Sequence, residues 1–258
     1  MPLLGRDAVA LITASSAGLG AATAKAFAAS GIRVIINYNS SADKAKALVQ
    51  ELETLQPSSA QDSTPRFHII QADVSKRSEI IRLVEESAAK MGRIDVVVSN
   101  HGWTRMRNFQ NLDENVEESD WDTCFNFNVK SHLFLFHAAK PHLEKSEGSF
   151  LSTASLAGIT PGGSSLAYSV TKAAQIHLVK GLAKTSGPKI RVNAVSPGLM
   201  LTEWGKNFPQ SKIDNNIANS VLKRLASVED VANMILCISN SSSQTGTNTV
   251  IEAGRTLS

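Results

Sequence analysis

Short apolar runs alternate with longer helix-forming segments along the whole chain, and this alternation strongly limits the possible folds. The first run, Ala8–Thr13, is continuously apolar, as in a strand that is buried on both faces of a parallel sheet. We expect strands at Ala8–Thr13, Arg33–Asn37, Arg66–Gln71, Ile94–Val98, Ser149–Ser152, Lys189–Ala194 and Thr249–Ile251. The segments between them predict helices at residues 21–30, Ala42–Leu55, Lys76–Met91, Trp121–Leu143, Ala167–Thr185 and Val228–Ser239.

This order of elements predicts an α/β protein built on one doubly wound, seven-stranded, mostly parallel sheet with helices on both faces. The 258 residues suit a single domain, residues 1–258, because no repeat or low-complexity segment divides them. Gln56–Pro65 is polar and flanked by prolines, so we expect a surface loop there and not a domain linker.

The composition argues against several classes of function. A net charge of +3, with no block of more than two basic residues, argues against a nucleic-acid partner. Cys124 and Cys237 lack the spacing of metal ligands, so we expect no metal site and two reduced thiols. Neither a charged-then-apolar leader nor an apolar run of membrane-spanning length is present, which makes the cytoplasm the expected location and a membrane partner unexpected.

Five of the expected strands end in polar or glycine-containing motifs: A-S-S-A-G-L-G, A-D-V, S-N-H-G, S-T-A-S and S-P-G. The carboxyl ends of parallel strands meet at one edge of the sheet, where the ligands of such sheets bind. The first motif, with Gly18 and Gly20, joins a strand to a helix, as in sites where a dinucleotide pyrophosphate docks on a helix N-terminus. We therefore favour a nucleotide site over a structural α/β protein with five unrelated loops.

Tyr168 and Lys172 are four residues apart in an expected helix, which places the phenol and the ammonium on one face. A phenol titrates near about pH 10, and lowering its pKa by roughly three units requires about 4 kcal/mol. A lysine at about 4 Å supplies an amount of that order at an effective dielectric near 20. Ser155 could donate to the oxygen of a carbonyl or alcohol while Tyr168 moves its proton. A solvated surface pair is the alternative for Tyr168 and Lys172 taken alone.

With these motifs in this order and at this spacing, the chain resembles the short-chain dehydrogenase/reductase (SDR) family over nearly its whole length. Thr13–Gly20 stands for the family's T-G-x-x-x-G-x-G loop, and Asn193–Gly198 for its nicotinamide-side loop. The resemblance implies a single Rossmann domain that binds NAD(P). It assigns cofactor contacts to Thr13, Ser15, Ser16, Gly18, Leu19, Gly20, Asn37, Asn39, Ser40, Asp73, Val74, Asn100, Gly102, Tyr168, Lys172, Pro197, Gly198, Met200 and Thr202.

The resemblance also implies hydride transfer between nicotinamide and a carbonyl or secondary alcohol. Tyr168 would be the general acid in reduction and the general base in oxidation, and Lys172 would lower its pKa and hold the ribose. Ser155 would orient the substrate oxygen, and Asn128 would hold a water that links Lys172 to solvent. Asn128 could equally be a capping or kink-forming residue within its helix, and both roles are compatible.

Three positions depart from the family pattern. Ala14 replaces the first glycine of the cofactor loop, so we expect a slightly altered turn and retained binding. His101 replaces an alanine, and we expect it either at the rim near the adenosine or, less favoured, in contact with substrate. Residues 252–254 read E-A-G where D-G-G is usual, which affects only the packing of the C-terminus.

The end of the second strand bears on the choice of cofactor. Sites that prefer NAD place an acidic residue there, on the ribose 2′-hydroxyl. Here the segment reads I-I-N-Y-N-S-S, and the first acid is Asp43, inside the next expected helix. A 2′-phosphate is therefore not repelled, although Ala17 stands where many NADP-preferring relatives carry Arg or Lys. We expect NADPH/NADP⁺ as cofactor, with NADH the poorer one and hydrogen-bond donors at Asn37, Tyr38, Asn39, Ser40 and Ser15 or Ser16.

The expected substrate region lies between the nicotinamide, the loop after Ser155 and a variable lid at about residues 199–225. Its side chains are mostly apolar, which favours a ring-bearing or lipophilic carbonyl or alcohol, unless they only pack the lid itself. The candidate contacts are Trp103, Ser155, Ile159, Trp204 and Phe208, with Pro161 and Leu199 nearby.

Together with the habit of the family, extra apolar residues on two helices suggest a homotetramer or homodimer: Leu133, Leu135, Phe136, Ile176, Leu178 and Leu182. Three functions remain open from the sequence. We favour an NADPH-dependent carbonyl reductase. The others are non-redox chemistry at the same site, such as dehydration, isomerisation or cyclisation, and non-catalytic nucleotide binding.

Overall fold

We describe the protein from a computed structural model, which covers residues 4–56 and 65–257. Within them, seven strands form one sheet in the order β3-β2-β1-β4-β5-β6-β7, and every neighbouring pair is parallel. This confirms the predicted fold class, and the sheet is wholly parallel where it was expected to be mostly so. The strands are β1 Val9–Ile12, β2 Arg33–Tyr38, β3 Phe67–Gln71, β4 Val96–Ser99, β5 Ser149–Thr153, β6 Arg191–Pro197 and β7 Asn248–Ile251.

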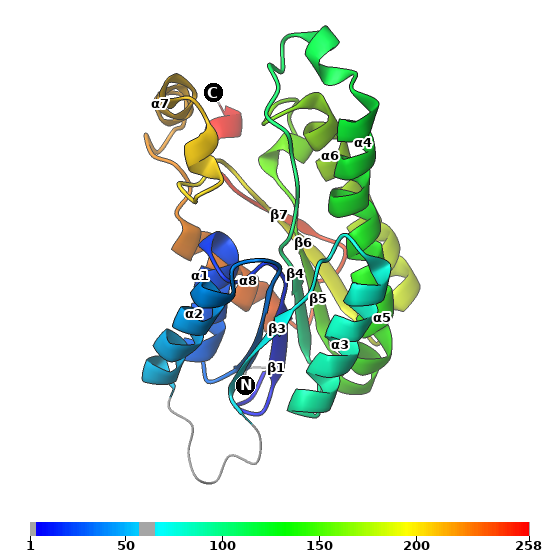
Figure 1. The fold of residues 1–258 in the computed structure, drawn as a ribbon. Helices are drawn as coiled ribbons and strands as arrows, with labels where there is room; N and C mark the ends of the chain where they lie inside the picture. The colour runs from blue at the N-terminus through cyan, green and yellow to red at the C-terminus, as the bar shows by residue number, and fades with distance from the viewer. Residues whose placement is uncertain (1–3, 57–64, 258) are drawn as a thin grey trace.

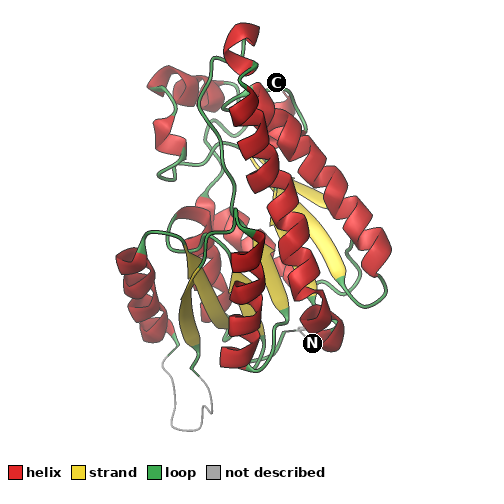
Figure 2. Cartoon of the chain, turned by 45° about the vertical axis from the view of Figure 1, so that its right-hand side comes forward, coloured by secondary structure: helices red, strands yellow, loops and turns green. Residues whose placement is uncertain are grey.

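Helices cover both faces of the sheet (Figures 1 and 2). On one face α1 (Gly18–Ala29), α2 (Ala42–Leu55) and α8 (Val228–Ser239) bury one apolar cluster. On the other face α3 (Arg77–Met91), α5 (Ser131–Ser146) and α6 (Leu166–Ser186) bury the second. Successive residues of β1 belong in turn to one apolar cluster and to the other, and this is why β1 is continuously apolar.

The helix expected at Trp121–Leu143 begins earlier and is interrupted. It consists of α4 (Glu118–Phe125), a π-helical turn η2 (Asn126–Lys130) and α5. Strand β6 also differs from the expectation, because Pro197 still pairs with Ile251 in the ladder of β7, so the strand continues past Ala194. The loop expected at Gln56–Pro65 lies, apart from its two end residues, outside the described residues.

The segment expected to form a lid contains secondary structure that the sequence did not indicate. A short 3₁₀ turn, η4 (Gly205–Asn207), is followed by helix α7 (Gln210–Ala218). Figure 1 shows α7 near the C-terminus, where η5 (Arg255–Leu257) lies. The chain after α7 contacts the C-terminal segment, since Leu222 N donates to Ala253 O at 3.1 Å. Across residues 4–56 and 65–257, every helix is too short or too polar to cross a membrane.

Candidate active site

A cavity of about 770 Å³ opens at the carboxyl edge of the sheet. It brings together segments that are far apart in the sequence: the turn after β1, the loops after β4, β5 and β6, helix α6 and the lid. The predicted site residues that line it are Gly18, Leu19, Asn100, Gly102, Ser155, Tyr168, Lys172, Pro197, Gly198, Met200, Thr202, Trp204 and Phe208.

The turn between β1 and α1 has the backbone that a close ligand needs. Gly18 adopts a φ of +54°, in the left-handed region. Gly20 packs so closely on the turn that a Cβ would lie 2.5 Å from the carbonyl oxygen of Ala14. Helix α1 begins at Gly18 with no acidic residue in its first turn and no capping side chain from the described residues. Its N-terminal N–H groups and dipole therefore favour an anion, as the sequence predicted.

Ala14 keeps the left-handed conformation that a glycine would supply at the first position of the loop, with a φ of 49°. The methyl group in this region costs about 1–2 kcal/mol. Asn37 stabilises the strained residue, because its Oδ1 accepts from the backbone N–H of Ala14 at 3.0 Å. The turn is thus held in shape by a side chain from β2.

Tyr168 lies at the start of α6, where Ser165 caps the helix by accepting from the N–H of Tyr168 at 3.2 Å. The phenol is half-buried, and the ring of Trp204 packs edge-on against it with centroids 5.8 Å apart. The hydroxyl of Ser155 is a hydrogen-bond partner of the phenol. The Nζ of Lys172 lies 5.5 Å from the centre of the Tyr168 ring. The three residues therefore meet in one place, as the sequence predicted.

The structure does not show the acidification of Tyr168 that the sequence led us to expect. Burial raises the pKa of Tyr168 to about 12, and the hydrogen bond from Ser155 offsets only part of this effect. Burial also lowers the pKa of Lys172 to about 7. A pKa of about 7 leaves the lysine only about half charged at neutral pH, which weakens its effect on the phenol.

Lys172 is held firmly although it is only 3% exposed. Its Nζ donates to the carbonyl oxygen of Thr153 at 2.8 Å and to Oε1 of Gln175 at 2.9 Å. Both acceptors are neutral, so neither compensates the buried charge as a carboxylate would. Two of the three N–H donors of the ammonium are used by these contacts, which leaves one to face the cavity side.

Asn128 lies within the π-helical turn η2 and is fully buried. Its Oδ1 accepts from the N–H of Trp103 at 2.8 Å, and its Nδ2 donates to the carbonyl of Trp103 and to Thr171. Asn128 therefore connects the interrupted helix to the loop after β4 and to α6. Turns of this kind recur at functional sites, and the water-holding role of Asn128 stays a prediction.

Two residues that we expected at the 2′-phosphate have other roles. Asn37 is 1% exposed, and besides holding Ala14 its amide donates to the carbonyls of Tyr38, Ile70 and Ala72. Ser15 is fully buried, and its hydroxyl donates to the carbonyl of Ile12 at 2.7 Å. These contacts occupy both side chains, so neither is free to donate to a phosphate.

The remaining candidates at that end lie at the surface or on the strand ends. Asn39 and Ser40 are exposed and Ser16 is half-buried. Burial alone would raise the pKa of Asp73, but hydrogen bonds from Ser75 and the charge of Lys76 lower it, so this carboxyl is ionised. Val74, next to it, is 7% exposed.

The ends of β1 and β4 are joined by the predicted residues Thr13 and Asn100. The hydroxyl of Thr13 accepts from the N–H of Asn100 at 2.9 Å, and Asn100 Nδ2 donates to the carbonyls of Thr13 and Ala14. Thr13 is fully buried, so its side chain shapes the edge of the sheet and is not exposed to a ligand.

His101 is among the residues that line the cavity, but its ring is buried behind the site. Its ring is 3% exposed, with Nδ1 2.8 Å from the Thr13 hydroxyl and Nε2 2.7 Å from the Ser131 hydroxyl. It stacks on His132 with centroids 4.2 Å apart. Burial lowers the pKa of His101 to about 3, so the ring is neutral and serves the packing behind the site.

The substrate candidates divide into two groups. Trp204 and Phe208 line the cavity, together with Pro161 and Leu199, whereas Trp103 and Ile159 are not among its lining residues. Trp103 is engaged through its backbone with Asn128, and Ile159 is 44% exposed.

Sequence reasoning missed Lys212 of α7, which also lines the cavity. Its Nζ donates to the carbonyl of Gly163 at 2.6 Å and lies 4.8 Å from the centre of the Phe208 ring. It also missed the buried partner of Lys172, Gln175. The signal for Gln175 was present, because a glutamine three residues after Lys172 falls on the helix face that carries the catalytic side chains.

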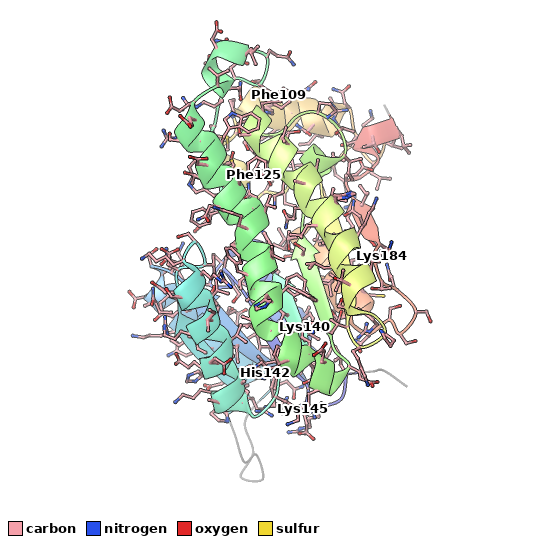
Figure 3. All side chains as sticks on the ribbon, turned by 90° about the vertical axis from the view of Figure 1, so that its right-hand side faces the viewer. Phe109, Phe125, Lys140, His142, Lys145 and Lys184 are labelled. Atoms are coloured by element: carbon pink, nitrogen blue, oxygen red, sulfur yellow. The ribbon has the colours of Figure 1, made fainter. Side chains whose placement is uncertain are left out.

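Three of the six residues proposed to support an oligomer are buried in the core of the single chain. Leu135, Phe136 and Leu182 are at most 8% exposed, so they do not argue for an interface. Leu133 is 38% exposed, and the same helices also expose Phe125 and Val170. Figure 3 shows this helical face, with Phe125 on it above Lys140, Lys145 and Lys184.

Comparison with known proteins agrees with the geometry. Residues 13–256 match the family described as enoyl-(acyl carrier protein) reductase. The chain is 33% identical over 245 residues to 3-oxoacyl-(acyl-carrier-protein) reductase FabG of Thermotoga maritima, which covers 94% of each protein.

Two solved structures have the same fold over nearly the whole chain. A short-chain dehydrogenase from Burkholderia cenocepacia in complex with NADP superposes with a TM-score of 0.86 at 30% identity, over 97% of this chain and 98% of that one. A 7α-hydroxysteroid dehydrogenase complexed with NADH and 7-oxo glycochenodeoxycholic acid gives a TM-score of 0.86 at 27% identity, over 96% and 93%. With the fold, the cavity and these relatives in agreement, the chain belongs to the short-chain dehydrogenase/reductase family and is an NAD(P)-dependent oxidoreductase.

Proposed function

We propose that this protein is an NADPH-dependent carbonyl reductase in which Tyr168 exchanges a proton with the substrate oxygen. The observation that carries the proposal is the meeting of Ser155, Tyr168 and Lys172 in a cavity that also reaches Gly18 and Thr202. One end of this cavity suits a pyrophosphate, and the other suits proton transfer.

The residues present fit a dinucleotide. The open N-terminus of α1 and the close approach at Gly20 suit the pyrophosphate. Lys172 has an N–H donor left for a ribose hydroxyl. Thr202 lies close to Gly18 in the cavity wall, since a Cβ on Gly18 would be 3.4 Å from Thr202 Cγ2. The bound nicotinamide would supply the hydride, and the protein residues would hold the cofactor, orient the substrate and move the proton.

The proton step follows from the state of the phenol. With a pKa of about 12, Tyr168 is protonated throughout the neutral range and is ready to donate, which favours the reductive direction. Ser155 donates a hydrogen bond to the same substrate oxygen. The ammonium form of Lys172 stabilises the phenolate that remains after the proton has left.

NADPH is proposed over NADH because the end of β2 carries no carboxylate that would repel a 2′-phosphate. Asn39 and Ser40 are exposed at that end and are the proposed donors. Relatives with bound NADP and with bound NADH are both known. Comparing kcat/KM for the two cofactors tests the proposal, and a clear advantage for NADH would reverse it.

The proposed substrate is a carbonyl compound with an extended apolar body. Trp204 and Phe208, from the segment 199–225 that we propose as the lid, line the cavity beside Tyr168. The named relatives include a 3-oxoacyl reductase and a dehydrogenase crystallised with a 7-oxo steroid acid, and the ketone of each lies on a larger molecule. Lys212 adds one cation to this wall, so the far end of the substrate need not be apolar.

We also propose that the chain is a homo-oligomer in the cytoplasm. Phe125, Leu133 and Val170 are exposed on the face formed by α4, α5 and α6, where a second copy could cover them. Both cysteines are free thiols, as in a reducing compartment. Sedimentation that finds only monomer at micromolar concentration would contradict the oligomer.

The function is tested by following NADPH consumption with a panel of ketones for the wild type and for Tyr168→Phe. We expect the variant to lose at least about a hundredfold in kcat, because general acid catalysis contributes about 10²–10⁴, while its affinity for NADPH is retained. Tyr38→Phe, at the only other tyrosine of the chain, is the matched control and should keep its kcat at saturating NADPH, because Tyr38 lies at the end of β2 and does not line the cavity. Product formation without NADPH consumption would indicate non-redox chemistry, and binding of NADPH without turnover would indicate a binding protein.

A further inference from the structure

A layer of polar side chains lies buried behind Lys172, on the side away from the cavity. Gln175 is fully buried and is the side-chain acceptor for the Lys172 ammonium, at 2.9 Å. His132, 1% exposed, lies next to it, with a ring nitrogen 3.2 Å from Gln175 Nε2. The proposed proton transfer uses neither residue directly.

The amide of Gln175 is fixed in one orientation. Its Nε2 donates to the hydroxyl of Ser152 at 2.6 Å and to the carbonyl of Thr153 at 3.2 Å. The amide oxygen is therefore the atom that points to Lys172. A flipped amide would place N–H groups against the ammonium and lose both donor contacts.

His132 supports this orientation from behind. Its Nδ1 lies 2.6 Å from the hydroxyl of Ser99, and its ring stacks on His101. Burial holds the pKa of His132 well below its usual range, so it is a neutral ring at the pH of function. A neutral imidazole can accept a hydrogen bond, and a charged one beside Lys172 would repel the ammonium.

The surroundings of Lys172 explain why one neutral acceptor matters. The titratable groups that act on Lys172, or on which its charge acts, are Tyr168 on α6, Cys124 on α4, His101 after β4 and His132 on α5. None of these four is a carboxylate. Against the cost of burial, the ammonium form is stabilised by the hydrogen bonds to Thr153 and Gln175 and by the face of the Tyr168 ring.

We propose that Gln175 is a positioning residue that keeps Lys172 in its ammonium form and aimed at the cofactor ribose, with His132 fixing the Gln175 amide. This inference rests on the proposed function for its catalytic consequence, but the contact between Gln175 and Lys172 can be tested without any turnover.

The test compares Gln175→Leu with Gln175→Glu. The first removes the acceptor, so the pKa of Lys172 should fall. The second places a carboxylate at the same distance, so the pKa should rise. One hydrogen bond to a charged group corresponds to a pKa change of about one to two in each direction. A side chain that only fills space would not change the pKa in opposite directions.

The first readout needs neither cofactor nor substrate. Unfolding in urea is measured from about pH 4.5 to about pH 10, a range over which an unfolded lysine remains largely charged, for each protein and for the same protein carrying Lys172→Met. The difference between the two curves isolates the titration of Lys172 in the folded state. We expect its midpoint near pH 7 in the wild type, lower in Gln175→Leu and higher in Gln175→Glu. Midpoints that coincide, or that move in the same direction, overturn the proposal.

The second readout is the dissociation constant for NADPH and kcat/KM with a ketone, across the same pH range. Gln175→Leu should lose about tenfold in NADPH affinity near pH 8, because lowering the pKa of Lys172 by about 1 leaves about tenfold less charged lysine there, and Gln175→Glu should keep it. If the wild type binds NADPH but reduces no ketone, the proposed function fails while the Gln175 result stands. His132→Leu should move the midpoint in the direction of Gln175→Leu, and an unchanged midpoint removes His132 from the proposal.

Discussion

Tyr168 and Lys172 lie one helical turn apart on α6, and burial disfavours charge on both of them. The phenol has a pKa raised to about 12, and the ammonium has a pKa lowered to about 7. The positions of the two residues could be predicted from Y-x-x-x-K, but their charge states could not. Charge depends on how deeply the pair is buried and on which acceptors surround it, and Gln175 and Thr153 contribute neutral ones.

Lys172→Met is expected to raise stability while it removes activity. A buried lysine costs free energy in the folded state as long as the unfolded chain holds it charged. A pKa lowered from 10.5 to about 7 corresponds to roughly 4 kcal/mol at pH 7, so Met should gain up to about that amount. The gain should shrink toward zero as the pH rises through about 10, where lysine is neutral in both states. Urea unfolding at pH 7 and pH 10 measures this, and equal effects at both pH values would count against a charge-based cost.

At the scale of elements, the strands were predicted more accurately than the connections between them. The alternation of apolar runs with helical segments located all the strands of the described sheet, and β1, which is covered on both faces, has no polar side. The π-helical turn at Asn128 and helix α7 were not predicted. Helix α7 has only nine residues, of which Ile213, Ile217 and Ala218 are apolar, so the segment is too short to stand out from a loop. One extra residue in a helical turn leaves no signal in composition.

The lid is connected to the loop after β5 by Lys212, whose Nζ donates to the carbonyl of Gly163. Lys212→Met removes this contact and the charge over Phe208. We expect KM for the ketone to rise severalfold, because a partly buried hydrogen bond such as this one is worth about 1 kcal/mol. The dissociation constant for NADPH should stay within about twofold. Lys206→Met, an exposed lysine of the same segment, is the control and should change neither value.

At the scale of the whole molecule, the sheet edge collects the site because every strand pair is parallel. This could be predicted from the alternation of elements, and so could the membership of Gly18, Ser155, Tyr168 and Thr202. The contacts of the polar residues behind this edge could not be predicted from the sequence. Thr13, Asn37 and Ser15 read as ligand contacts in the sequence, yet in the structure their side chains hold the strand ends together. A polar residue at a strand end can do either, and only its burial decides between the two roles.

Two buried neutral histidines should make the protein sensitive to acid. An unfolded histidine binds a proton below about pH 6.5, whereas folded His101 does not until about pH 3. The unfolded state then binds more protons, so stability falls with decreasing pH, by about 1.4 kcal/mol per pH unit for each such histidine. We expect His101→Ala to reduce this slope between pH 6 and pH 4, and His177→Ala, at an exposed position, to leave it unchanged. Equal slopes in all three proteins would contradict the burial of His101.

The central claim is that Tyr168 becomes the proton-transferring group when the site holds its cofactor. The chain has two tyrosines, so in Tyr38→Phe an ultraviolet titration of phenolate reports Tyr168 alone. We predict no phenolate up to about pH 10 in the free protein, and a phenolate that titrates clearly below about pH 10 when NADP⁺ is bound. A ribose hydroxyl that accepts a hydrogen bond from Lys172 would favour the ammonium form of this lysine. The positive charges of the ammonium and of the nicotinamide ring of NADP⁺ would then both favour the phenolate. A phenol that titrates at the same pH with and without NADP⁺ would contradict the account.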